Sequence, residues 1–175
     1  AMAYPPAIFV SIASYRDPEL FPTLKDMIQH ASAPHGLHIA VCWQDEEDFS
    51  VFIDAGFIVS GVAGAQDVRV FHFAGASVTV ISRHYLTSEG ACWARHLSET
   101  CYQQEPYFLQ IDSHCRFIRG WEQQMITLLE SLKTISPLPI LSAYPPGYRP
   151  GEDEITGRQS SVSRMIFREF TREGI

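Results

Sequence analysis

The sequence has few cysteines and no long apolar run, two features that would indicate a zinc ribbon or a membrane protein. Its 175 residues contain four cysteines, Cys42, Cys92, Cys101 and Cys115, and no two of them form a C-x-x-C pair. A zinc ribbon is therefore not expected. We expect free, buried thiols, the usual state in a reducing cytosol, and hence a cytoplasmic protein. No apolar run reaches the roughly 18–20 residues of a membrane span, so no span is expected.

Basic residues are also scarce. The chain has 13 Lys and Arg against 20 Asp and Glu, a net charge of −7. Nucleic-acid binding depends on clustered Lys and Arg that displace counterions from phosphates, so we expect no nucleic-acid partner. The acidic balance still allows a local basic pocket for a diphosphate, because electrostatic focusing is local. Hydrophobic residues make up 46% of the sequence, enough for one domain with a substantial core.

Strand and helix patterns alternate along the chain. Asp17, Pro18 and Glu19 are typical of a helix start, because Asp caps, Pro suits the first turn and Glu faces the positive end of the dipole. Further helices are expected from residue 87 to about 102 and from about 121 to 133. Strands are expected at residues 7–13, 37–43, 68–73, 77–81, 107–111, 138–143 and 163–170. This alternation indicates an α/β fold with a mainly parallel sheet.

Two of these helices have a predicted inner face. The first should end near residues 30–33 and bury Leu20, Leu24, Met27 and Ile28. The second should bury Ala91, Ala94, His96, Leu97 and Cys101. Residues 44–48 are expected to form an acidic loop or a helix start, and residues 144–151 a proline-rich loop.

The run from Tyr107 to Phe117 carries the strongest functional signal. Apolar residues at 107–109 and 111 predict a strand that is buried on both faces, and the strand ends in Asp112-Ser113-His114. An acid and a histidine two residues apart, at the carboxyl end of such a strand, can direct oxygen and nitrogen at one ion. In open α/β sheets, ligands bind outside that end. The triplet resembles the Asp-x-Asp-like motif with which nucleotide-sugar transferases hold a divalent metal against a diphosphate.

The segments around this motif resemble one known family in order along nearly the whole chain. The chain is similar to the N-acetylglucosaminyltransferases that modify hydroxyproline in cytosolic proteins. The matching segments are VSIASYRD at 10–17, VCWQ at 41–44, Ala94-Arg95, FLQIDSH at 108–114 and SAYPPGY at 142–148. Asp112-Ser113-His114-Cys115 followed by Trp121 also resembles the polypeptide N-acetylgalactosaminyltransferases.

The resemblance implies a Rossmann-like GT-A fold, with residues 1–175 as a single catalytic domain. It also implies a metal-dependent, retaining enzyme that moves N-acetylglucosamine from UDP-GlcNAc to a hydroxyl acceptor on a protein, a glycan or a small molecule. Asp112 and His114 would hold the metal, Mn²⁺ or Mg²⁺, and an Asp/His pair suits a metal that accepts mixed oxygen and nitrogen ligands.

The nucleotide-sugar site that the resemblance implies draws on four segments. The strand-end backbone would bind the base, and Arg16 would bind phosphate or ribose, unless Arg16 pairs with Asp17 or Glu19 instead. Arg95 would reach the pyrophosphate, lock Asp112 in place, or lie on the surface. Trp43 and Trp121 would each be a core residue or lie near the ligand. The expected site residues are Ala13, Ser14, Tyr15, Arg16, Gln44, Arg95, Asp112 and Ser113.

The sequence departs from the galactosamine relatives after the motif. Those enzymes use a third metal ligand, a downstream histidine, and an acid near the acceptor. This chain has no histidine after His114, and Glu152, Asp153 and Glu154 are the only nearby acids in a plausible loop. Either the chain lacks a C-terminal third, or water or disordered sequence completes the site. We therefore assign no catalytic residue.

Three alternatives to a retaining transferase follow from these residues. No side chain is an obvious nucleophile, which fits a front-face retaining mechanism. An inverting GT-A transferase would instead need a carboxylate base among residues 152–154. The other two alternatives are a non-catalytic or truncated nucleotide-sugar binding domain and a purely structural α/β domain.

Overall fold

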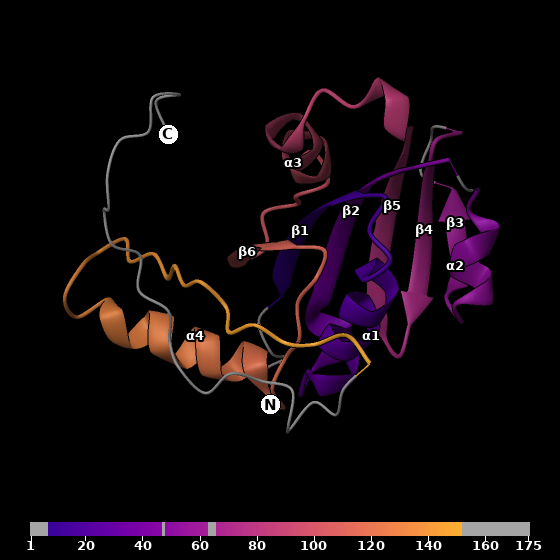
Figure 1. The fold of residues 1–175 in the computed structure, drawn as a ribbon. Coiled ribbons are helices and arrows are strands. Elements are labelled where there is room, and N and C mark those ends of the chain that lie inside the picture. The colour runs from indigo at the N-terminus through magenta and orange to yellow at the C-terminus, as the bar shows by residue number, and fades with distance from the viewer. Residues whose placement is uncertain (1–6, 47, 63–65, 152–175) are drawn as a thin grey trace. The chain divides into compact units, whose positions relative to one another are not determined.

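In the part of the chain that the structure describes, six strands form one sheet in the order β3-β4-β5-β2-β1-β6 (Figure 1). The computed structural model describes residues 7–46, 48–62 and 66–151. The strands are β1 Ile8–Tyr15, β2 Leu37–Asp45, β3 Ile58–Val62, β4 Val68–Phe73, β5 Ala76–His84 and β6 Tyr107–Asp112. The helices are α1 Leu20–His30, α2 Ser50–Asp54, α3 Ala91–Glu99 and α4 Trp121–Leu132, with 3₁₀ turns at Pro34–Gly36 and Tyr85–Thr87.

The sheet is mainly parallel, as expected for an α/β fold. β1 pairs in parallel with both β2 and β6, and β2 pairs in parallel with β5. The remaining pairs, β3 with β4 and β4 with β5, are antiparallel and form a meander at one edge. The chain moves from β1 to β2 on one side and later returns to place β6 on the other. The strand order therefore reverses at β1, which is where open α/β sheets bind ligands.

One face of the sheet is covered by an aromatic core. The Phe52 ring of α2 lies 4.8 Å from the ring of Phe21, 5.1 Å from Trp43 and 5.0 Å from Phe71, measured between centroids. The predicted inner face of α1 packs on the same core, and its side chains are at most 1% exposed: Leu20, Leu24, Met27 and Ile28. Trp43 is thus a packed core residue.

The opposite face of the sheet is covered by α3, and small residues lie where the helix packs on the strands. Alternate residues of β1 point to opposite faces, so Val10 and Ile12 join the aromatic core while Ser11 faces α3. The Ser11 hydroxyl lies 2.6 Å from the Ser98 hydroxyl, and Ala94 is fully buried. Small side chains on both elements allow the helix to approach the sheet closely.

Helix α3 differs from its prediction at its start and on its inner face. It begins at Ala91, because a 3₁₀ turn at Tyr85–Thr87 and a left-handed Gly90, with φ of 99°, precede it. Its inner side is formed by Ala94 and Ser98, whereas Ala91 and His96 are exposed. The expectation that Ala91 and His96 lie on the inner face was wrong.

Strand β6 exists as expected, but it is not buried on both faces. It lies at the edge of the sheet, and its side chains alternate between half-buried and exposed, with Phe108 46% exposed. Its apolar character reflects partial contacts, such as Phe108 with Phe9 at 5.4 Å between ring centroids. Edge strands and central strands can have similar runs of apolar residues. The apolar run at residues 107–111 therefore did not show that β6 lies at an edge of the sheet.

The chain consists of two compact units, Ala1–Leu128 and Leu129–Ile175. In the described part of the second unit, the strand predicted at residues 138–143 is absent, and only Tyr144 makes an isolated bridge. Pro137 and Pro139 cannot donate ladder hydrogen bonds, which disfavours a strand there. The strand predicted at residues 163–170 lies outside the described residues.

Two elements were not predicted, α2 and β3. Residues 44–48 were expected to be an acidic loop or a helix start, and α2 begins at Ser50 just beyond them. All four cysteines are free, but only Cys42 is buried; Cys92 is exposed and Cys101 and Cys115 are partly exposed, so the expectation of buried thiols was wrong for these three. Burial raises the pKa of the Cys42 thiol to about 11. None of the helices in the described ranges has the length and apolar content needed to cross a bilayer.

Candidate functional site

The carboxyl ends of four parallel strands, β1, β2, β5 and β6, lie side by side along one edge of the sheet. This edge runs across the ends of the strands and differs from the lateral edge that β6 forms. In the register of the sheet, Ala13 of β1 pairs with Asp112 of β6, and Tyr15 pairs with Gln44 of β2. Gln44 in turn pairs with Arg83 of β5. Residues from segments far apart in the sequence, including most of the predicted site, are therefore neighbours at this edge.

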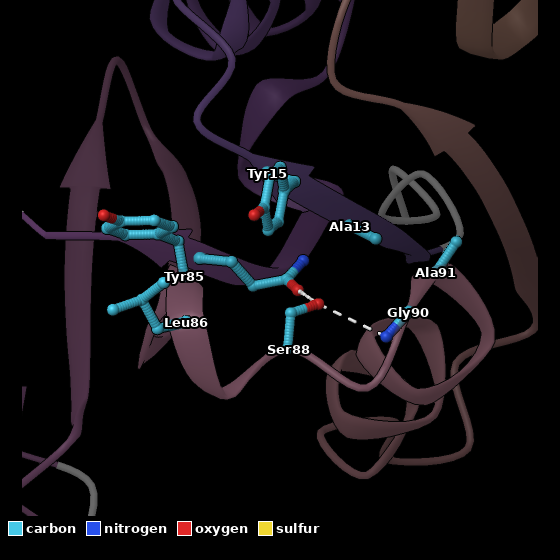
Figure 2. A pocket seen from close by; sticks show the side chains of 8 residues that line it. Ala13, Tyr15, Tyr85, Leu86, Ser88, Gly90 and Ala91 are labelled. Atoms are coloured by element: carbon cyan, nitrogen blue, oxygen red, sulfur yellow. Dashed lines mark hydrogen bonds between the residues drawn. The ribbon is translucent and has the colours of Figure 1, made fainter.

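A cavity of about 520 Å³ opens at the same edge. Figure 2 shows Tyr85 and Leu86 at one end of the group of lining residues, and Gly90 and Ala91 at the other. Three of the predicted site residues contribute to the wall, Ala13, Tyr15 and Gln44. The full lining is Ala13, Tyr15, Gln44, Tyr85, Leu86, Ser88, Gly90 and Ala91.

Gln44 connects the two sides of this cavity. Its side-chain nitrogen donates to the Ser14 carbonyl at 3.1 Å, and its side-chain oxygen accepts the Ser88 hydroxyl at 2.5 Å. Ser88 also accepts the backbone N–H of Gly90 at 3.2 Å. The Gln44 amide is only 2% exposed, so this chain of hydrogen bonds holds the loop before α3 against the ends of β1 and β2.

Arg16 lies beside the cavity in a strained conformation. Its backbone is left-handed, with φ of 46°, and its N–H donates to the Gln44 carbonyl at 3.0 Å. The guanidinium stacks over the Tyr85 ring, 4.3 Å from the centroid, and lies 3.4 Å from Glu46. The structural alternative considered for Arg16, pairing with Asp17 or Glu19, is thus replaced by contacts with Tyr85 and Glu46.

Arg95 of α3 contacts the first residue of the predicted metal motif. Its Nη2 lies 3.0 Å from Asp112 Oδ1, and the two side chains are 33% and 61% exposed. Its Nε is buried and has no hydrogen-bond partner among the described residues. Of the three roles considered for Arg95, the structure shows the contact that would hold Asp112 in place.

The His114 ring contacts the carboxylate of Asp17, which the sequence had indicated as a helix start and as an alternative partner of Arg16. Asp17 Oδ2 lies 2.8 Å from His114 Nδ1 and accepts the Ser113 hydroxyl at 2.6 Å. Asp17 Oδ1 accepts the Glu19 N–H at 2.9 Å, so the expected role at the helix start is also present. Burial acts to raise the pKa of the Asp17 carboxyl, but the hydrogen bonds from Ser113, His114 and Glu19 outweigh it and hold this pKa below its ordinary value.

The loop that carries the motif is bound to α1 by side-chain hydrogen bonds. Thr23 is fully buried, and its hydroxyl donates to the Ser113 carbonyl at 2.8 Å and accepts the Cys115 N–H at 3.0 Å. Further along, Asp26 accepts the Phe117 N–H at 2.5 Å, and the Trp121 indole donates to the Met27 carbonyl at 2.9 Å. Trp121 is 3% exposed, so it is a core residue.

Five predicted site residues lie outside the cavity lining, and two of them, Ser14 and Ser113, are buried. Ser14 is 1% exposed, and its hydroxyl has no partner among the described residues. Ser113 is 4% exposed and donates to Asp17. Their roles in ligand binding remain predictions. The candidate carboxylates of an inverting mechanism, residues 152–154, lie outside the described residues.

A metal at Asp112 and His114 would have two protein ligands. In the described ranges, no group of three or more His, Cys, Asp or Glu residues is arranged to hold a metal ion. Asp112 and His114 are both 61% exposed, so each can reach an ion at the surface of the site. Such a donor pair fits Mg²⁺ or Mn²⁺, which commonly take their other ligands from water and from a bound diphosphate.

Sequence reasoning missed the residues that follow β5 and the second function of Asp17. Tyr85, Leu86 and Ser88 come directly after a strand that runs parallel to β2, so a correct assignment of the β5 direction would have placed them at the ligand-binding edge. Asp17 was already prominent in the sequence. Its contact with His114 spans 97 positions, and no local pattern reports it.

Comparison with known proteins places the chain in a family. A family model described as Glycosyltransferase (GlcNAc) matches residues 7–66 and 52–175. These matches cover most of the sequence, and the chain belongs to this glycosyltransferase family. A sugar donor and an acceptor are therefore its reactants. No curated protein was found to match the chain.

Proposed function

We propose that this protein transfers N-acetylglucosamine from UDP-GlcNAc to a hydroxyl acceptor, with retention of anomeric configuration and with Mn²⁺ or Mg²⁺ held by Asp112 and His114. The acceptor hydroxyl belongs to a protein, a glycan or a small molecule. The family match supports glycosyl transfer, and its description supports the sugar. The mainly parallel sheet is compatible with a GT-A arrangement.

The observation that carries this proposal is the position of Ala13. It lines the cavity, and it is also the register partner of Asp112. A diphosphate bound beside the Asp112 side chain would thus continue into a cavity large enough for part of a nucleotide or sugar. Tyr15 and Gln44 supply an aromatic ring and an amide at the same wall.

Two positive groups contact residues at or beside the cavity, which suits a diphosphate. Arg16, just after β1, stacks on the lining residue Tyr85, and Arg95 of α3 contacts Asp112, the register partner of the lining residue Ala13. A guanidinium is well shaped to bind phosphate oxygens. Gly90 and Ala91, at the N-terminus of α3, line the cavity, and the N-cap residue, Gly90, has no side chain with which to cap the helix. The dipole of a nine-residue helix favours an anion there.

The described residues would act mainly by binding and orientation. A bound metal would supply Lewis-acid stabilisation of the departing diphosphate. Arg95 holds Asp112, Gln44 holds the loop before α3, and the cavity positions the donor relative to the acceptor. Since no described side chain at this edge is an obvious nucleophile, a front-face reaction fits, in which the leaving phosphate accepts the proton of the acceptor hydroxyl.

The first experiment is a calorimetric titration of UDP into the protein, with Mn²⁺ and then with a chelator. We expect binding only with the metal, and at least tenfold weaker binding in Asp112→Asn and His114→Ala. Asp54→Asn and His96→Ala change exposed residues of the same types, on α2 and α3, and should bind like the wild type. Metal-independent binding, or unchanged affinity in both site variants, would contradict the proposal.

Retention needs a separate measurement. The UDP-sugar carries an α-linked donor, so retention predicts an α-linked product, which NMR of the anomeric proton identifies. A β-linked product would establish the inverting alternative. Metal-dependent UDP binding with no transfer to any hydroxyl acceptor would instead indicate a nucleotide-sugar binding domain.

A further inference from the structure

Asp17 is placed to control the imidazole ring of His114. Its side chain is 16% exposed, whereas that of His114 is 61% exposed, so the carboxylate lies behind the ring on its protein side. Asp17 comes from the segment before α1, and His114 follows β6, so two distant parts of the chain meet in this contact. Nothing in the local sequence around either residue requires this pairing.

The hydrogen bonds at Asp17 make it a supporting group and not a ligand. Its two oxygens already accept three donors, the Glu19 N–H at 2.9 Å, the Ser113 hydroxyl at 2.6 Å and a ring nitrogen of His114 at 2.8 Å. Three of the roughly four lone-pair positions of a carboxylate are therefore occupied. Little capacity is left for a metal ion at these oxygens.

The direction of the His114 contact follows from the chemistry of the two groups. An ionised carboxylate only accepts hydrogen bonds, so His114 Nδ1 must carry the proton and donate it. In a neutral imidazole the other nitrogen, Nε2, then has a free lone pair. Partners of this kind fix the tautomer and the ring orientation of histidines that bind metals.

We infer that Asp17 is a positioning residue, which holds His114 in the Nδ1–H tautomer and leaves Nε2 as the nitrogen that binds the metal. The metal-binding half of this inference rests on the proposed function. The tautomer half does not, because it concerns the metal-free protein.

The backbone around His114 is held independently of Asp17. Thr23 bonds the Ser113 carbonyl at 2.8 Å and the Cys115 N–H at 3.0 Å, on either side of His114. Loss of the Asp17 charge should therefore change the tautomer of the His114 imidazole, while the loop around His114 stays in place. This separates a positioning role from a purely structural one.

The test compares wild type with Asp17→Asn and with Glu19→Gln. Glu19 is a matched control, since it also contacts the motif loop from the start of α1, through Arg116 at 2.6 Å. Two-dimensional NMR of ¹⁵N-labelled histidine, in metal-free protein at about pH 8, reports the tautomer of each ring. The His114→Gln variant identifies the signal of His114.

We expect His114 to be the Nδ1–H tautomer in wild type and Glu19→Gln, and mainly the Nε2–H tautomer in Asp17→Asn. An Nε2–H tautomer in wild type, or an unchanged tautomer in Asp17→Asn, would overturn the inference. The melting temperature of each variant shows whether the fold is retained. Asp17→Glu, if the fold tolerates the longer side chain, should restore the Nδ1–H tautomer that Asp17→Asn loses.

The affinity for Mn²⁺ tests the second half of the inference, that His114 Nε2 binds the metal. With UDP present, Asp17→Asn should bind Mn²⁺ about 10–100-fold more weakly than wild type, the usual effect of losing such a partner. Equal affinity in the two proteins would show that Asp17 has no influence on the metal. If wild type binds no Mn²⁺, the proposed function and the metal-binding half fail together, and the NMR result still decides whether Asp17 sets the tautomer.

Discussion

At the scale of single residues, Thr23 shows how one hydroxyl can hold a functional loop. Thr23→Val keeps the shape of the side chain but leaves the Cys115 N–H and the Ser113 carbonyl without their partner. We expect the free energy of unfolding to fall by about 1–3 kcal/mol, as measured by urea denaturation. Thr100→Val removes an exposed hydroxyl at the end of α3 and should change it by less than about 0.5 kcal/mol. Equal losses in the two variants would refute this role for Thr23.

Glu105 gives a second prediction at this scale, for pH dependence. Burial acts to raise its pKa, but hydrogen bonds from the His38 ring at 2.8 Å and the Gln103 N–H at 2.7 Å outweigh it, so the pKa of this carboxyl is lowered. A carboxyl with a lower pKa in the folded state stabilises the fold above its unfolded pKa, and that stability is lost as the pH falls through the folded pKa.

The consequence can be measured by urea denaturation between about pH 7 and pH 3. Glu105→Gln should be less stable than wild type at neutral pH, and its stability should fall less on acidification. Glu89→Gln, at an exposed position, should keep the pH dependence of wild type. A Glu105→Gln curve parallel to that of wild type would show that the group contributes nothing to acid sensitivity.

At the scale of elements, the packing of α3 on the sheet depends on small side chains. Ala94 is fully buried against a face that includes Ser11 and Ala40, so Ala94→Leu has no space for its added atoms. Overpacking of this kind costs about 1–3 kcal/mol. We also expect weaker UDP binding, since α3 carries Arg95 and its N-terminus lines the cavity. His96→Leu, on the exposed side of α3, should leave unfolding and binding unchanged, and a similar loss there would argue against close packing as the cause.

The helices and strands also show why parts of the fold could be predicted. α1 was predicted correctly because its cap, its proline and its 3.6-residue apolar stripe all lie within the helix or next to it. β6 was found but misplaced, because an apolar run indicates a strand without indicating whether the strand is central or at an edge. The strand expected at residues 138–143 did not form because Pro139 within it and Pro137 just before it cannot donate ladder hydrogen bonds.

At the scale of the molecule, the aromatic core unites α1, α2 and the sheet. Phe52 is fully buried and lies next to Phe21, Trp43, Phe57 and Phe71. Phe52→Ala should therefore lower the free energy of unfolding by about 3–5 kcal/mol, measured by urea denaturation. Ile53→Ala changes the next residue of α2, which is 53% exposed, and should have a much smaller effect. A small loss in Phe52→Ala would mean that α2 is not an integral part of this core.

The candidate site could be predicted only in part, because strand ends are visible in the sequence whereas contacts between distant residues are not. Asp112, His114 and the end of β1 were proposed as site residues because they lie at or just after strand ends. The contact of Arg95 with Asp112 was one of the roles considered for Arg95. The contacts of Asp17 with His114 and of Gln44 with Ser88 were not predicted, since they join residues 97 and 44 positions apart.

The sequence by itself determined the fold class, the main strand ends and the two residues proposed to hold a metal, because periodicity, caps and short motifs are local properties of the chain. Only the tertiary structure decided that Tyr85 and Ser88 share a cavity with Ala13, and that Asp17 supports His114. These relations depend on which strands are neighbours and in which register. That choice is made by burial of the whole core, in which every strand and helix takes part.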